Sequence, residues 1–136
     1  MMMRMYLVIL FAIIFGNETI GQGSNKMREQ IVGSWKFDKI YTPDNEEMKD
    51  LPKILFETIW EYENNSIFSE YKLKLNGEGF SKKSGYWYFK KDDSIVQIDH
   101  HGKEFNIIIE SISDNEVKLK CKNRVIKLLR FDKRLN

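Results

Sequence analysis

The sequence has little of three things. It contains one cysteine, two prolines and no segment with helical periodicity long enough to connect parallel strands. The single cysteine, Cys121, excludes an internal disulfide, so a hydrophobic core must supply the stability. The missing helices argue against a parallel α/β architecture. A net charge of +2, with lysines interleaved among acids, lacks the basic footprint of a nucleic-acid-binding protein, and no nucleic-acid partner is expected.

The first 21 residues are predicted to be a secretory signal peptide. Arg4 precedes a continuous apolar run over 5–15, and the small residues Thr19 and Gly21 fit the positions before a cleavage site. We expect cleavage before Gln22, with a cut after Gly23 as the alternative. At about 1.5 Å per residue the run is shorter than the roughly 30 Å hydrocarbon core, so no stable membrane span is expected after cleavage. No cysteine lies near the cut, so lipid attachment there is excluded, and a secreted or periplasmic location follows.

The remaining residues, 22–136, are expected to form one domain built from short strands. Residues 24–30 form a short helical lead-in, with Ser24 as N-cap and with Met27 and Ile31 on one face. A first strand follows over about 32–41. Residues 42–53 carry both prolines and form the longest loop, which leaves room for one helical turn at 46–51.

From residue 54 the chain alternates between apolar and polar residues, with turn residues between the runs. The expected strands are 54–62, 67–75, 78–82, 86–89, 94–99, 104–110, 116–121 and 124–131. Asn76 and Gly77 predict a type I′ hairpin turn, and Ser84 with Gly85 is expected to break or bulge its return strand. Eight or nine short strands joined by tight turns favour an antiparallel up-and-down β-barrel, with a strongly curled sandwich as the alternative.

Several segments resemble the bacterial lipocalin-like domain family, which consists of small exported barrels. They are Ile-Val-Gly-Ser-Trp-Lys at 31–36, Leu-Asn-Gly-Glu-Gly at 75–79, Gly-Tyr-Trp-Tyr-Phe at 85–89, and the strand, serine-bearing turn and strand over 105–119. The resemblance covers nearly all of residues 22–136. It implies that Gly33 and Trp35 lie at the closed base of a barrel, beneath a basic residue of the last strand, either Arg124 or Arg130.

No motif for catalysis, metal binding or cofactor binding stands out. The chain has no Gly-x-Ser-x-Gly elbow and no phosphate-binding glycine loop. His100 and His101 are adjacent in a turn-like segment, and neighbours on an extended chain point in opposite directions. Glu57, Glu61 and Glu63 all fall on one side of the expected strand, as on a solvent-facing strand. We therefore expect a protein that is not an enzyme and uses no metal or cofactor.

The aromatic residues are the most informative group for function. Eight fall on positions expected to face inward: Trp35, Phe37, Phe56, Trp60, Tyr62, Tyr71, Trp87 and Phe89. Either they fill the barrel solidly, or Trp60, Tyr62, Tyr71 and Trp87 line a cavity for a small hydrophobic or aromatic molecule.

The first alternative indicates a packed barrel acting as a protein-interaction, inhibitor or cell-envelope structural module. The second indicates a ligand-binding protein. Tyr86 and Tyr88 are expected on the outside, where they suit a protein-binding face. Cys121, on the apolar side of an alternating strand, is expected to be a buried small residue.

Overall fold

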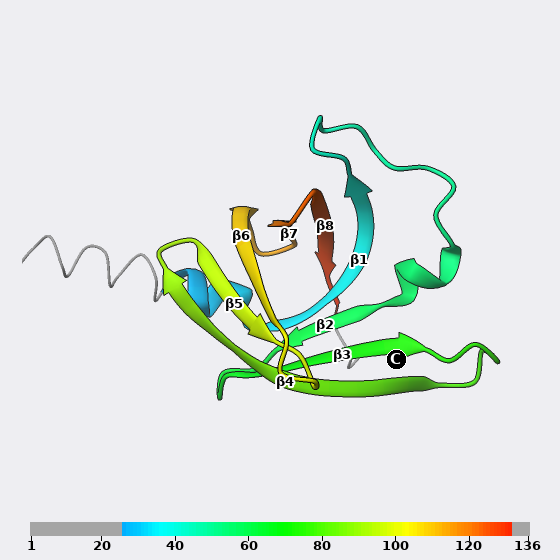
Figure 1. Ribbon diagram of the computed structural model, residues 1–136, viewed down its shortest axis with the longest axis horizontal. Coiled ribbons are helices and arrows are strands. Elements are labelled where there is room, and N and C mark those ends of the chain that lie inside the picture. The colour runs from blue at the N-terminus through cyan, green and yellow to red at the C-terminus, as the bar shows by residue number, and fades with distance from the viewer. Residues whose placement is uncertain (1–25, 132–136) are drawn as a thin grey trace, which may run out of the picture.

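The computed structural model describes residues 26–131, which form a closed antiparallel barrel of eight strands in which each strand pairs with the next and β8 pairs with β1 (Figure 1). The strands are β1 (Gly33–Tyr41), β2 (Ile59–Tyr62), β3 (Ile67–Leu73), β4 (Phe80–Lys91), β5 (Ser94–Ile98), β6 (Glu104–Ile112), β7 (Glu116–Cys121) and β8 (Arg124–Arg130). The up-and-down barrel predicted from the sequence is confirmed. The predicted leader, 1–21, and its cleavage site before Gln22 lie outside the described residues.

The return strand of the long hairpin is continuous, so the predicted break at Ser84 and Gly85 is wrong. β4 passes through both residues, and Gly85 is buried against the backbone of Ile98, whose carbonyl oxygen a Cβ would overlap. Glycine is therefore needed for close approach of the backbones rather than to end the strand.

The predicted hairpin turn is in the right place but has a different geometry. Of Asn76 and Gly77 only Gly77 has a positive φ, whereas a type I′ turn requires it at both residues. The Asn76 side chain instead accepts a hydrogen bond from the Glu78 N–H at 2.9 Å. Lys74 and Gly79 then close a longer loop through a backbone hydrogen bond.

The predicted strand over 54–62 begins too early. A 3-10 helix, η1 (Lys53–Glu57), occupies its first part, and β2 starts only at Ile59. Pro52 precedes η1 with a φ of −59°, and its carbonyl accepts a hydrogen bond from the Leu55 N–H. Proline favours such a start because its fixed φ suits a helical turn and it has no N–H to satisfy. No helical turn forms at 46–51, where one is predicted, and the helical turn lies at η1 instead.

The inward face predicted for β3 is also wrong. Tyr62 on β2 pairs with Phe68, so Phe68, Glu70 and Lys72 face the lumen. Tyr71 lies outside the barrel, where its hydroxyl donates to Glu61 at 2.9 Å. Glu70 and Lys72 can face inward because the part of the lumen beside them is a cavity and not a packed core.

One end of the barrel is closed by the helix over residues 26–31. Ile31 is fully buried beneath the barrel and Met27 packs against the same core, as predicted. The Trp35 indole is completely buried, and its Nε1–H donates to the Ile31 carbonyl at 2.8 Å. The helix is thereby tied to the first strand at the base.

Arg130 completes this base. Its Cζ lies 3.9 Å from the centroid of the Trp35 ring, within the range of a cation–π interaction. Its guanidinium donates to the Val32 carbonyl at 2.9 Å and to the Gln30 carbonyl at 2.7 Å. The last strand is therefore joined to the helix and to the first strand by one side chain.

Arg124 does not take part in this contact. It begins β8 beside Cys121, at the opposite end of the barrel, and its guanidinium donates to the Asn123 carbonyl. The alternative that Arg124 is the basic partner of Trp35 is wrong, because antiparallel pairing places Arg130, not Arg124, opposite Trp35.

Gly33 is needed at the base for two reasons. Its φ is +133°, a backbone conformation that side chains disfavour, and a Cβ there would overlap Nη1 of Arg130. We expect Gly33→Ala to destabilise the protein by more than the about 1–3 kcal/mol of backbone strain alone. Chemical denaturation followed by circular dichroism measures the change.

A double-mutant cycle separates the two reasons. In an Arg130→Ala background the overlap is gone, so Gly33→Ala should cost less, with a coupling of about 0.5–3 kcal/mol. Gly77→Ala is the control, because Gly77 also has a positive φ but a Cβ there would have no neighbour within 4 Å. An equal cost of Gly33→Ala in both backgrounds would contradict a close contact with Arg130.

Candidate functional site

The lumen is packed solid toward the base. A chain of aromatic contacts, most of them edge-to-face, runs through its interior, with ring centroids 5.0–5.9 Å apart. In order, the rings belong to Phe37, Trp60, Phe68, Tyr62, Trp87 and Phe89. Arg28 of the helix covers the basal end of this chain, with its Cζ 4.6 Å from the Trp87 ring centroid. Tyr62 and Trp87 are fully buried within this packed part.

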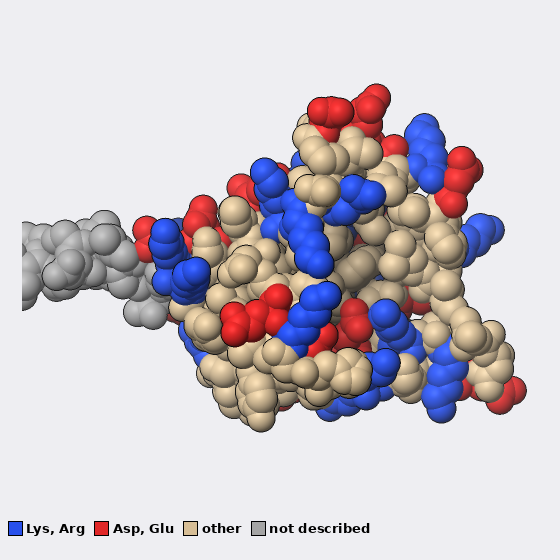
Figure 2. All heavy atoms as spheres, viewed as in Figure 1, with Lys and Arg blue, Asp and Glu red and all other residues tan. Residues whose placement is uncertain are grey.

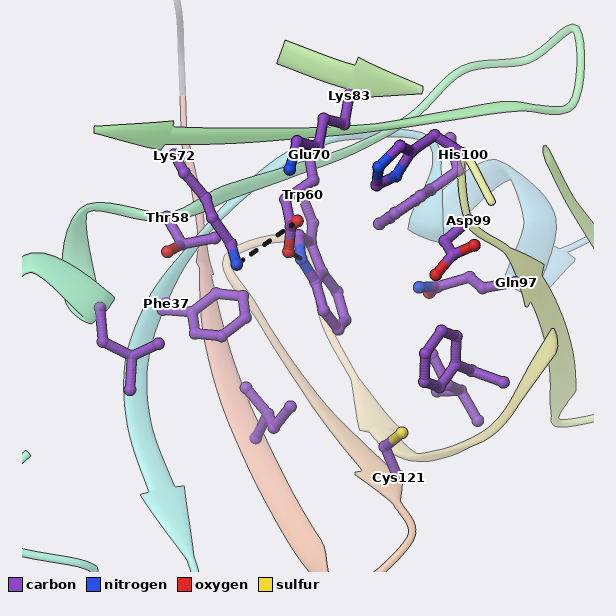
Figure 3. A pocket seen from close by; sticks show the side chains of 15 residues that line it. Phe37, Thr58, Trp60, Glu70, Lys72, Lys83, Gln97, Asp99, His100 and Cys121 are labelled. Carbon is purple, nitrogen blue, oxygen red and sulfur yellow. Dashed lines mark hydrogen bonds and ion pairs between the residues drawn. The ribbon is translucent and has the colours of Figure 1, made fainter. Parts of the chain in front are cut away.

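Above this packed part the lumen opens into a cavity of about 450 Å³ (Figure 3). Most of its wall is apolar and comes from six of the strands and η1: Phe37, Leu55, Trp60, Phe68, Phe105, Ile107, Cys121 and Ile126. The cavity reaches the surface, because Lys83 and His100 in its wall are exposed. The sequence left open whether the aromatic residues fill the barrel or line a cavity. The structure has both features, because the base is packed and the upper lumen is hollow.

Charged side chains gather on one side of the cavity, where β3 and β4 lead out of the barrel. Glu70 accepts a hydrogen bond from the Trp60 Nε1–H at 2.9 Å, and its other oxygen lies 3.8 Å from Lys72 Nζ (Figure 3). Lys83, paired with Glu70 across the strands, also lines the cavity. The cavity is thus amphipathic, apolar in its depth and charged near its opening.

A buried polar pair lies at the boundary between the packed base and the cavity. The Tyr62 hydroxyl donates a hydrogen bond to Oε1 of Gln97, whose side chain lines the cavity. Burial raises the pKa of the Tyr62 hydroxyl well above its ordinary value, so the hydroxyl remains a neutral donor. The Gln97 side chain is therefore held in place and presents a fixed amide to an occupant of the cavity.

The two histidines lie in a hydrogen-bonded turn at the cavity opening. Asp99 accepts hydrogen bonds from the backbone N–H groups of Lys103 and His101, which lower the pKa of its carboxyl. The rings of His100 and His101 lie against each other, with centroids 3.8 Å apart, and His100 lines the cavity. Within residues 26–131, no cluster of three or more His, Cys, Asp or Glu side chains is placed to hold a metal ion.

The four residues predicted to contact a ligand fall in three different places. Trp60 lines the cavity. Tyr62 and Trp87 lie beneath it in the packed base, and Tyr71 lies outside the barrel. The reasoning from sequence missed Phe68, Phe105 and Ile107 as wall residues, although the apolar alternation over 105–109 is a signal that could have found the last two.

Comparison with solved structures finds the same barrel elsewhere. A lipocalin-like protein from Bacteroides uniformis ATCC 8492 superimposes with a TM-score of 0.60 at 15% identity, over 75% of this chain and 99% of that one. The fold is a lipocalin-like barrel. An uncharacterized protein from Bacteroides eggerthii DSM 20697 matches with a TM-score of 0.60 at 14% identity, over 74% of this chain and 99% of that one. No family model and no curated protein matches the sequence.

The lipocalin-like barrel presents its cavity at the end opposite Trp35 and Arg130. In the part of the chain that the structure describes, no helix is both long and apolar enough to cross a bilayer.

Cys121 offers a direct probe of the cavity. It is half-buried in the cavity wall, and burial raises the pKa of its thiol. Because the thiolate is the reactive form, we expect alkylation by iodoacetamide at neutral pH to be slower in the folded protein than in the protein unfolded by urea. The rate in the folded protein should rise at a higher pH than the rate in the unfolded protein, because burial raises the pKa of the Cys121 thiol. Equal rates for folded and unfolded protein at neutral pH would contradict this placement of the thiol.

Proposed function

We propose that this protein is an exported, non-catalytic binding protein that holds a small hydrophobic or aromatic molecule in the upper lumen of its barrel. The observation that carries the proposal is the cavity of about 450 Å³, which exceeds the roughly 300 Å³ at which ligand sites begin. Its wall is largely apolar, with a few polar groups in fixed positions, the composition typical of small-molecule sites.

The wall also indicates what the molecule looks like. Phe37, Phe68 and Ile107 suit an apolar or flat body, and the Gln97 amide suits one hydrogen-bonding group on that body. Lys72 and Lys83 lie where the cavity opens, so a polar or anionic end of the molecule is favoured there. The barrel-shaped container and the predicted signal peptide together support export with a bound molecule.

Substitutions in one strand test the proposal. Ile107 faces the cavity and is 1% exposed, whereas its neighbour Ile108 faces outward and is 42% exposed. Ile107→Trp should fill the cavity and weaken binding of the probe anilinonaphthalene sulfonate at least about tenfold, the equivalent of about 1.4 kcal/mol. Ile108→Trp is the matched control and should bind the probe as the unmodified protein does. Titration followed by fluorescence gives both affinities, and thermal unfolding verifies that both variants fold.

The same site is examined without a chosen probe by native mass spectrometry of the purified protein, followed by solvent extraction. An adduct that is lost in Ile107→Trp and retained in Ile108→Trp supports the proposal. A bound molecule should also protect Cys121 from alkylation, since the thiol lines the cavity. Probe binding of equal strength in both variants, with no protection of Cys121, would overturn it.

A second candidate function is protein interaction through the outer face of β4, β5 and β6. Tyr86, Tyr88 and Ile108 are exposed there, and Ile98 and Val96 lie opposite the two tyrosines on β5. Exposed apolar side chains grouped on a sheet face are typical of interaction surfaces. This candidate replaces the first if the purified protein holds no molecule and the probe does not distinguish Ile107→Trp from the unmodified protein.

A further inference from the structure

The hairpin of β3 and β4 extends beyond the rest of the barrel. β2 pairs with β3 only as far as Tyr71, and β5 pairs with β4 only from Tyr86 onward. Residues 72–81 therefore form a stretch two strands wide, closed by the loop over 74–79, and at its root residues 82–85 of β4 pair with β3 but not with β5. We call residues 72–85 the ribbon (Figure 1). The ribbon lies beside the cavity opening, since Lys72 and Lys83 at its root line the cavity.

Apolar side chains are exposed on this ribbon. Leu75 in the loop is 96% exposed and Phe80, which pairs with Leu73, is 43% exposed. Between the ribbon and η1 lies an apolar groove of about 290 Å³ lined by Pro52, Ile54, Leu55, Thr58, Lys72, Leu73 and Leu75. Because Leu75 is almost fully exposed, only a surface outside this protein can bury its side chain.

The charge on the ribbon is strongly positive. Lys72, Lys74, Lys82 and Lys83 are all exposed, and Glu78 is the one acid over residues 72–83. Of the groups that face these lysines, Glu70 is near Lys72 Nζ and the Tyr71 ring lies beneath Lys82. In Figure 2, drawn in the same view as Figure 1, basic side chains gather over the projecting hairpin, with an acidic group at its far end.

We propose that the tip of this hairpin docks on the surface of an anionic lipid bilayer. Exposed apolar side chains flanked by lysines match such a surface, because the apolar groups enter the boundary of the acyl chains while the ammonium groups contact lipid phosphates. The aliphatic part of a lysine side chain can lie among apolar groups while its ammonium group remains in water, which suits the boundary between acyl chains and headgroups. Protein interfaces are depleted of lysine and bury about 800 Å² on each side, which a narrow, lysine-rich ribbon matches poorly.

Docking by this hairpin would bring the cavity opening to the lipid surface. If the proposed function is right, the bound molecule can then move between the bilayer and the lumen along the groove beside η1. That consequence rests on the proposed function, whereas the docking itself does not.

Vesicle flotation with the full-length mature protein tests the docking. We expect the protein to float with vesicles of phosphatidylcholine mixed with phosphatidylglycerol, much less with phosphatidylcholine alone, and less at high salt. Leu75→Asn should weaken binding about tenfold or more, because one buried leucine is lost. The pair Lys74→Gln and Lys82→Gln should weaken it about fivefold per lysine.

Matched controls use similar residues elsewhere on the barrel. Leu129→Asn removes an exposed apolar residue from the outer face of β8, and the pair Lys90→Gln and Lys91→Gln removes two exposed lysines from the other end of β4. Both should bind vesicles as the unmodified protein does. Equal binding to the two kinds of vesicle, no binding to either, or equal losses in the control and hairpin variants would overturn the proposal.

Failure of the docking and failure of the proposed function give different results. Leu75→Asn should keep its affinity for anilinonaphthalene sulfonate, because Leu75 does not line the lumen cavity. Ile107→Trp should lose probe binding and still float with anionic vesicles. A loss of vesicle binding in Ile107→Trp with its fold intact would place the lipid contact in the lumen and overturn docking by the hairpin.

Discussion

Arg130 holds the closed end of this barrel together. Its guanidinium lies on the Trp35 ring and donates to two carbonyls at the end of the N-terminal helix, so three segments meet at one side chain. Gly33 leaves the space that the guanidinium occupies. A base fixed in this way lets the other end remain open, because the barrel does not depend on filling its whole lumen for stability. The cavity and its charged opening are possible because the base supplies the packing.

Much of the fold could be predicted from the sequence. Strands such as β6 and β7 show clean alternation, and polar turns separate them, so period-2 reasoning placed them correctly. Trp35 was expected at the base because the segment around it resembles the start of a lipocalin-like barrel. The choice between Arg124 and Arg130 required the register of β8 against β1, which short-range patterns do not contain.

The candidate site was harder to predict, and β3 shows why. Its residues alternate between apolar and polar, but the polar set that includes Glu70 and Lys72 faces inward. The rule that the apolar side of an alternating strand faces the interior assumes a packed interior without water. It fails where the lumen is hollow and reaches solvent. Tyr71 was therefore assigned to the wrong face. At η1 the alternation over 54–62 continued through a turn that Pro52 initiates, so pattern alone could not locate the start of β2.

The pairing of β8 with β1 also has a consequence for how the chain folds. The contacts of Arg130 with Val32 and Gln30 join residues 98 and 100 positions apart in the sequence. During synthesis these contacts cannot form until β8 has left the ribosome. Until then the earlier strands can form only an open meander with unpaired edges. Such long-range closure is slow compared with local hairpin formation. The barrel can therefore close only when its last strand, β8, is available to pair with β1.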